Sequence, residues 1–513
     1  MTMESSTRPA GMLGHLTDQP KGIYLLFTVE MWERFSFYGM RGMLVLFLTA
    51  ATQQSGFGWS NAKALNLYGL YVGLVYFTPL VGGYLADHWL GHRRAVIGGA
   101  VLMAIGHFLM AGPALIPILF SYFYGLPVEQ IFQNAGVELG LMTMTPSVSQ
   151  GLQVELAGTL SAAAVDAASG PLEWAYLLTG WSFYLAISFI ILGNGLFKPN
   201  MTTLVGGLYS RTDPRRDSGF TIFYLGINLG AFLANLTAGT VGALWGWHYG
   251  FTIAGFGMVT GLLVLMKFQS RILGDIGLEA PHKKRKRDGL NKIQMTRIER
   301  NRILAILVFG IFSIVFWTGF EQGGGLLNLF AENKVDRTIF GFTVPTPWFQ
   351  SLNPLFIMLF APLISALWIG LSTKGSDPST PHKFALALAL MGAGFVCMIV
   401  SALEWSSSGS SHMIWLVAAY LFHTLGELCI SPVGLSLVNR LSPERMASLM
   451  MGVWFLSFSA SGWLAGKVGS MAEALSELTV FTGLTAASFA AALVLVVLNK
   501  PLKYLMHDDE AHT

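Results

Sequence analysis

The sequence predicts an all-α integral membrane protein, and three observations lead to this fold class. The 513 residues have a mean hydropathy of +0.56, and only 12% of them are charged, whereas an ordinary soluble domain carries about 25% charged residues. Apolar stretches long enough to cross a bilayer, about 20 residues each, recur along the chain. Basic residues gather in alternate connections between these stretches.

The apolar stretches predict twelve transmembrane helices. The first twenty residues are polar, and the first apolar stretch is interrupted by Glu30, Glu33 and Arg34, unlike the apolar core of a cleavable signal peptide. We therefore expect this stretch to remain as the first helix. The predicted spans are 24–50, 61–87, 94–111, 179–203, 218–244, 247–268, 301–330, 347–372, 383–404, 412–437, 445–467 and 478–499.

The basic residues predict the orientation, because cytoplasmic loops are enriched in Lys and Arg. Every second connection is basic, which places both chain ends in the cytoplasm and the chain in the cytoplasmic membrane. The run at 282–287 could also indicate nucleic-acid binding, but a topology-setting loop explains it better. We expect no nucleic-acid partner. The basic positions are Arg93, Arg94, Arg211, Arg215, Arg216, 282–287, Lys374, Lys383, Arg440, Arg445, Lys500 and Lys503.

The order of spans predicts two six-helix bundles. Residues 1–268 form the first, 269–300 a basic cytoplasmic linker, and 301–513 the second. Such halves resemble transporters built from repeats, which bind substrate near the midplane between them, although no strong repeat is visible here. Residues 95–197 contain neither Lys nor Arg, so we expect an extracytoplasmic insertion at about 112–175. Its beginning, 112–124, could instead extend the third span or re-enter the membrane.

The first span carries an unusual set of charges on one face. At 100° per residue, Glu30, Glu33, Arg34, Tyr38 and Arg41 fall within an arc of roughly 140°. A charge at the centre of a membrane helix costs about 2.5–3.5 kcal/mol. Four charges facing lipid would threaten insertion, so this face must point into a protein interior or a water-filled cavity. The alternative to a functional role is an ion-pair cluster that only fixes packing.

Single charges also lie deep in later spans. The first half has Lys198 in the fourth span, whereas the second half has Glu321 in the seventh and Glu427 in the tenth. Cations thus lie in one half and acids in the other. A short peptide is a zwitterion whose ends are about 7–11 Å apart for two or three extended residues. Its carboxylate would meet the cationic half and its amine the acidic half.

Several motifs identify a family resemblance. Residues 82–94, GGYLADHWLGHRR, resemble the loop signature of the major facilitator superfamily. The ExxER run at 30–34, the FxxFYxxINxGAF run at 220–232 and the GExxISPVGLS run at 426–436 resemble proton-dependent oligopeptide transporters, a branch of that superfamily. The resemblance covers nearly all spans but fails over about 112–175 and 269–300. It implies a major facilitator fold with a central cavity and proton-coupled import of di- and tripeptides by alternating access.

The resemblance also implies residue roles. Glu30, Glu33 and Arg34, with Glu321, resemble the proton-coupling residues, and Phe320 replaces the first of two acids that most members have there. Arg41 with Glu321, and Lys198 with Glu427, resemble gating pairs across the halves. The implied peptide-binding residues are Arg34, Tyr38, Arg41, Tyr71 and Lys198 toward the carboxylate end, Asn228, Asn353 and Glu427 toward the amine end, and Trp317, Trp454, Ser431 and Gln350 along the cavity.

Other readings of the sequence are less well supported. A carrier of nitrate or an organic anion would use the basic residues but not Glu427, Asn228 and Asn353. A membrane enzyme would need a nucleophile with a base, a metal cluster or a nucleotide loop, and none is found. A channel would not need the paired charges. We expect protons as the coupling ion, no cofactor or metal, the lipid bilayer as surroundings, and a functional monomer.

The remaining polar and sulfur-containing residues of the spans give weaker signals. His107 and His423 are intramembrane but match no motif, and His248 is expected to pack at an outside helix end. Cys397 and Cys429 lie in apolar runs, which predicts buried thiols with neither a disulfide nor a metal site.

Overall fold

The first half of the chain is a bundle of six long helices. A computed structural model describes residues 18–210, 212–280, 295–443 and 446–507. The basic run at 282–287, Arg211 and Arg445 therefore lie outside the described residues. The elements of the first half are α2 (Lys21–Thr49), η1 (Thr52–Gln54), α3 (Asn61–Leu85), η2 (Ala86–Leu90), α4 (His92–Leu109), α5 (Gly112–Tyr124), α6 (Val128–Ala135), α7 (Pro146–Thr159), α8 (Ala162–Gly206), α9 (Arg216–Trp245) and α10 (Trp247–Leu273).

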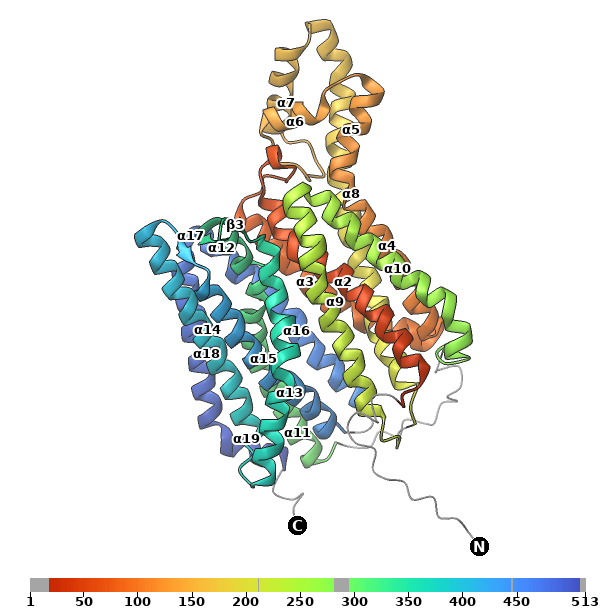
Figure 1. The fold of residues 1–513 in the computed structure, drawn as a ribbon, viewed down its shortest axis with the longest axis vertical. Coiled ribbons are helices and arrows are strands. Elements are labelled where there is room, and N and C mark those ends of the chain that lie inside the picture. The colour runs from red at the N-terminus through yellow and green to blue at the C-terminus, as the bar shows by residue number, and fades with distance from the viewer. Residues whose placement is uncertain (1–17, 211, 281–294, 444–445, 508–513) are drawn as a thin grey trace.

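The second half is a second bundle of six long helices beside the first (Figure 1). Two short strand pairs join its loops: β1 with β4 in parallel, and β2 with β3 as an antiparallel hairpin. Its elements are α11 (Arg297–Phe320), η4 (Glu321–Gly324), α12 (Leu326–Lys334), β1 (Val335–Asp336), β2 (Thr338–Ile339), β3 (Phe342–Thr343), η5 (Thr346–Ser351), α13 (Leu352–Thr373), α14 (Thr380–Ser408), β4 (Ser411–His412), α15 (Ile414–Leu441), α16 (Ala447–Ser470), α17 (Ala472–Leu475), α18 (Glu477–Val497) and α19 (Asn499–Met506).

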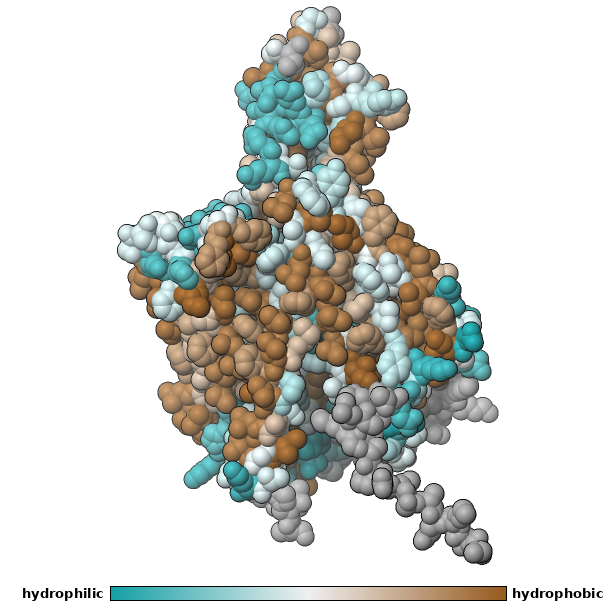
Figure 2. Space-filling view, in the orientation of Figure 1, coloured by the Kyte–Doolittle hydropathy of each residue, from teal (hydrophilic) through white to brown (hydrophobic). Residues whose placement is uncertain are grey.

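The helices confirm the predicted membrane fold. Among the described residues, ten helices are individually long and apolar enough to cross a membrane, and α4 with α5, bent by 53°, makes eleven if the pair counts as one span. The long helix α2 does not meet that criterion, because it carries five charged residues. Each predicted span overlaps one of these twelve helices. Apolar side chains cover the middle of the visible face of both bundles, and hydrophilic ones gather toward the ends (Figure 2).

Residues 112–175 project beyond the bundles as an arm (Figure 1). The arm contains α5, α6, α7 and the beginning of α8, on the face opposite the start of α2 and the end of α19. The predicted fourth span, 179–203, lies inside α8, which begins earlier, at Ala162, and has 45 residues. Such a helix is about 68 Å long, more than twice the roughly 30 Å hydrocarbon core. Its first part, which includes the small residues at 162–170, therefore extends into the predicted insertion.

The predicted seventh span, 301–330, lies within one helical segment that is long and apolar enough to cross a membrane, Arg297–Lys334, but the α-helix inside it is interrupted. Helix α11 ends at Phe320, η4 follows, and α12 begins only at Leu326. Three consecutive glycines, Gly323 to Gly325, cause the break, because glycine is the least helix-favouring residue after proline. The break places Glu321 at a helix end, where its side chain can turn toward the first half.

The two halves touch closely on the arm face. The α-carbons of Gly69 on α3 and Gly466 on α16 approach so closely that a side chain on either would clash with the other backbone. One turn further along α3, the Ser459 hydroxyl donates to the carbonyl of Gly73 at 2.7 Å. A third contact joins η5 to α9, where the Ser351 hydroxyl donates to the carbonyl of Phe232 at 2.8 Å. The described structure is thus closed on the face that bears the arm.

Candidate functional site

A cavity of about 140 Å³ lies between the two bundles. Helices from both halves line it: α2, α3 and α9 on one side, and α11, η5, α13 and α15 on the other. Eight of the residues predicted to bind peptide, couple protons or form gating pairs line this cavity. They are Tyr38, Arg41, Asn228, Trp317, Glu321, Gln350, Asn353 and Glu427.

The charged face of α2 points into the protein, as the cost of exposing it to lipid requires. Glu30, Glu33 and Arg34 are each at most 3% exposed. The Arg34 guanidinium lies 3.0 Å from Glu30 and 2.5 Å from Glu33. Asn194 on α8 donates to the second oxygen of Glu33 at 3.4 Å. Two carboxylates share one guanidinium, so the fully ionised cluster has a net charge of −1. One carboxylate can therefore bind a proton while the other keeps its ion pair with Arg34.

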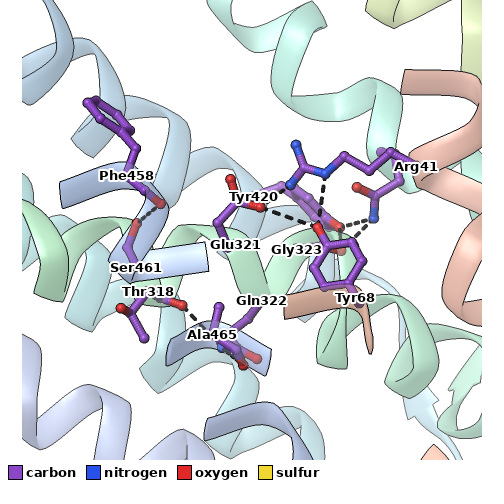
Figure 3. Close-up of polar contacts among 11 residues, drawn as sticks. Arg41, Tyr68, Thr318, Glu321, Gln322, Gly323, Tyr420, Phe458, Ser461 and Ala465 are labelled. Atoms are coloured by element: carbon purple, nitrogen blue, oxygen red, sulfur yellow. Dashed lines mark hydrogen bonds and ion pairs between the residues drawn. The ribbon is translucent and has the colours of Figure 1, made fainter. Parts of the chain in front are cut away.

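Arg41, two turns further along α2, forms an ion pair with Glu321 from the other half. Tyr68 on α3 joins them: Arg41 Nε donates to its hydroxyl at 2.9 Å, and that hydroxyl lies 3.3 Å from Glu321. Figure 3 shows this group between the two bundles. The structure therefore brings together the first of the two pairs predicted across the halves, on the closed side of the cavity.

The glycine break beside Glu321 is held in place by a polar network. The carbonyl of Gly323 accepts a hydrogen bond from the Tyr420 hydroxyl at 3.0 Å (Figure 3). It also accepts one from Gln350 at 2.6 Å. Gln322 donates to the carbonyl of Ala465 on α16 at 3.0 Å. The two bonds to Gly323 use a backbone carbonyl that the interrupted helix leaves free. They fix the position of the Glu321 carboxylate.

Glu427 belongs to a second polar group, on the wall formed by the second half. Asn353 Nδ2 donates to Glu427 at 2.7 Å and lies 3.0 Å from the Thr424 hydroxyl. The Asn228 amide donates to the carbonyl of Tyr224 on its own helix at 3.0 Å, which leaves its oxygen available. An acid with two amides is a suitable set of acceptors for an ammonium group.

Lys198 and Glu427 do not form an ion pair in the described structure. The Lys198 ammonium lies 4.3 Å from the centre of the Tyr76 ring, within its own half, a distance that permits a cation–π interaction. Glu427 is held by Asn353 within the other half. Because Tyr76 lines the cavity, Lys198 still reaches its wall from the first half.

Five predicted binding residues are not part of the cavity lining: Tyr71, Trp454, Ser431, Arg34 and Lys198. Tyr71 is 1% exposed and its ring stacks near Phe37 with a centroid distance of 6.3 Å. Trp454 is 2% exposed and fills the space that Gly434 leaves on α15. Ser431 is half-buried on α15. Glu30, Glu33, Arg34 and Lys198 also stand behind the residues that line the cavity.

Sequence reasoning missed several lining residues. Tyr420 and Thr424 lie seven and three residues before Glu427, so helical spacing places all three on one face of α15. The same spacing, applied to the neighbours of Glu427, could have identified them. Phe320 packs edge-on against Trp317, with ring centroids 5.0 Å apart, and gives the cavity an apolar side. Tyr76 and Tyr224 add hydroxyl groups from the first half.

The intramembrane histidines differ in position. His423 lines the cavity and is packed against Phe395, with a centroid distance of 4.7 Å. His107 is fully buried beside Gly255 and away from the cavity. His248, at the arm-side end of α10, packs against Tyr249 with ring centroids 4.1 Å apart and ring planes tilted by 41°. No group of three or more His, Cys, Asp or Glu residues in the described ranges is arranged to hold a metal ion.

Comparison with known proteins identifies sequence relatives along the whole chain. The model of the POT family matches residues 93–272 and 279–485. A relative named peptide transporter YePEPT, from Yersinia enterocolitica, is 32% identical, and the alignment covers 99% of both chains. A di-/tripeptide transporter of Lactococcus lactis subsp. cremoris is 30% identical, over 96% of this chain and 97% of the relative.

Solved structures with the same fold are also similar over nearly the full length. A peptide transporter of the POT type, in complex with sulfate, superposes with a TM-score of 0.77 at 30% identity and 98% coverage of both chains. A POT family transporter in complex with 5-aminolevulinic acid gives a TM-score of 0.75 at 26% identity, covering 94% of this chain and 97% of the other.

Proposed function

Because the chain belongs to the POT family, we propose that it is a proton-coupled symporter that imports di- and tripeptides across the cytoplasmic membrane by alternating access. The protein is a transporter and not an enzyme. The observation that carries the proposal is the cavity between the halves, with Glu427 and Asn353 on one wall and the cations Arg34 and Lys198 behind the other. One face of this cavity is closed by Arg41 and Glu321.

The distribution of charge fits a zwitterionic substrate. A peptide ammonium would bind Glu427 and Asn353, while the carboxylate would approach the half that holds Lys198 and Arg34. Two or three extended residues span about 7–11 Å. If the transporter binds mainly the two charged ends of the peptide, few contacts depend on the peptide side chains. We therefore expect it to accept peptides of many different sequences. Phe320 and Trp317 would accept apolar side chains.

Proton coupling would arise in the cluster on α2. When a proton binds Glu30 or Glu33, one of the contacts to Arg34 is weakened, and the guanidinium becomes available to the peptide carboxylate. Proton binding and peptide binding then support each other, since two ligands that favour the same state are thermodynamically linked. Protons are the coupling ion, and no other cofactor is needed. We propose that a single chain in the bilayer is the functional unit.

The decisive experiment is uptake of a labelled dipeptide into liposomes that contain the purified protein. An inward proton gradient should drive accumulation, and unlabelled di- and tripeptides should compete while free amino acids compete weakly. Uptake that is insensitive to the proton gradient would refute coupling. Competition by nitrate or an organic anion, with none by peptides, would favour an anion carrier instead.

The basic connections support an orientation in which the start of α2 and the end of α19 are cytoplasmic and the arm is outside. We call the arm face the outer face from here on. In a chain without its two native cysteines, Val154→Cys on the arm should react with an impermeant thiol reagent in intact cells. Tyr504→Cys on α19 should react only after lysis. The Val154 and Tyr504 side chains are 65% and 62% exposed, so a difference in labelling would not come from a difference in solvent exposure. The reverse pattern would invert the topology.

A further inference from the structure

The outer end of α3 is capped by a residue of the other half. The first four amides of a helix lack partners within it. In α3, the Ser60 hydroxyl accepts from the amide of Lys63 at 3.3 Å, and the amide of Ala62 donates to the Glu473 carboxylate at 2.6 Å. The first turn of α3 contains no acidic residue of its own. Glu473 therefore supplies the negative charge that favours a helix N-terminus.

Glu473 belongs to α17, the short helix between α16 and α18 in the second half. Its bond to Ala62 thus crosses the boundary between the bundles, at the outer rim. Two turns further along α3 lies the close approach of Gly69 and Gly466. The buried pair of Arg41 and Glu321 lies beside it, because Tyr68, the residue before Gly69, bonds to both members of that pair. The bond of Glu473 is thus the contact at the outer rim, and the other two lie deeper along the same boundary.

The arm holds the same end of α3 from the opposite side. Lys63, the residue after Ala62, forms an ion pair with Glu138 of the arm. The Trp59 indole donates to the carbonyl of Leu139 at 2.8 Å, and the Lys63 ammonium lies 4.2 Å from the centre of the Trp59 ring. The start of α3 is therefore fixed to its own half through the arm, and Glu473 bonds to a firmly held amide.

We propose that Glu473 is a gating residue, whose carboxylate caps α3 across the two halves and holds the outer face closed. This inference rests on the proposed alternating-access function. If the halves separate on the outer side to admit a peptide, the bond to Ala62 must break. Removal of the carboxylate then favours the outward-open state by the amount that the cap contributed to closure.

The test measures how often the cavity opens outward. A reporter cysteine replaces Ile227, which lines the cavity, in a chain whose native Cys397 and Cys429 are alanine. Intact cells are exposed to an impermeant thiol reagent. Glu473→Ala should raise the labelling rate by about three- to tenfold, the order of effect that loss of a helix cap has on an equilibrium. The matched control is Glu477→Ala: Glu477 is four residues away but pairs with Lys334 inside its own half at 2.8 Å. It should leave the rate unchanged.

A second variant separates failure of this inference from failure of the proposed function. Glu321→Gln weakens the buried pair and should also raise labelling. If Glu321→Gln raises the labelling rate and Glu473→Ala does not, the bond between Glu473 and Ala62 does not hold the outer face closed, and the inference is overturned. If neither changes the rate, neither contact acts as a gate and the inference is overturned, while the proposed function is judged separately by proton-driven peptide uptake in liposomes.

A cross-link tests the same place by holding the two positions together with a covalent bridge in place of the hydrogen bond. Cysteines at Ala62 and Glu473, joined by a short bifunctional reagent, should stop peptide uptake, and a cleavable linker should restore it when cut. The same pair without linker serves as the control for folding. Full uptake by the cross-linked protein would show that this contact stays closed throughout the cycle, which would overturn the inference.

Discussion

Replacement of Glu427 by Gln should weaken binding of free dipeptides by at least about 30-fold while N-acetylated dipeptides lose little. Removing one charge of a buried, hydrogen-bonded pair costs about 2–5 kcal/mol, and acetylation removes the ammonium that would use this charge. Glutamine keeps the size of the side chain and can still accept from Asn353, which donates to Glu427 at 2.7 Å. The inhibition constants of free and N-acetylated dipeptides are measured from their inhibition of labelled dipeptide uptake.

Replacement of Lys198 by Ala should show the opposite preference. Dipeptides should lose affinity, whereas analogues without a terminal carboxylate should lose little, and Lys198→Arg should keep most of the binding. The reason is the position of the ammonium at the wall formed by Tyr76, in the half opposite Glu427. Equal losses for all ligands in both the Lys198 and the Glu427 variants would make these charges structural.

Much of the fold follows from the sequence because a membrane restricts it. In a bilayer, long apolar stretches can only be helices whose backbone groups bond internally. The direction of the charged face of α2 was equally predictable, because Glu30, Glu33 and Arg34 cannot face lipid. Their burial, at most 3% exposed, agrees with that argument. The ion pair of Arg41 with Glu321 was implied by the family resemblance, since the residues are 280 positions apart.

The details that escaped prediction depend on local packing or on conformation. Averaged hydropathy hid the break at Gly323 to Gly325, because the flanking residues are strongly apolar. It also hid the early start of α8, where small residues are helical because α5 and α7 pack beside them. Whether Lys198 meets Glu427 depends on which face of the transporter is closed. The same sequence must support the outward-open and the inward-open state, so composition and spacing do not determine the distance between Lys198 and Glu427.

We expect Glu33→Gln to abolish proton-driven accumulation while peptide exchange continues. A membrane potential contributes about 2.3 kcal/mol per charge and 100 mV, which for one proton corresponds to a concentration ratio of roughly fifty. Without coupling, the ratio should fall to about one. Glutamine keeps the shape of the side chain and can still accept from Asn194, which lies 3.4 Å from Glu33, but it cannot be ionised and so removes the charge beside Arg34. Exchange of labelled for unlabelled peptide requires no net proton movement and should persist.

The two activities together distinguish coupling from packing in the cluster on α2. Both are measured in the same liposomes, first with an inward proton gradient and then with unlabelled peptide inside and no gradient. Glu404→Gln is the control, because that acid lies near the end of α14 and bonds to residues of the following β4 and the start of α15, such as the Trp415 indole at 2.9 Å, so the change should leave both activities intact. Loss of both activities in well-folded Glu33→Gln would mean that the cluster is structural. Retention of both activities would show that Glu33 is not the proton-coupling residue. The coupling step would then be assigned to Glu30 or Glu321, the other carboxylates held by a buried arginine.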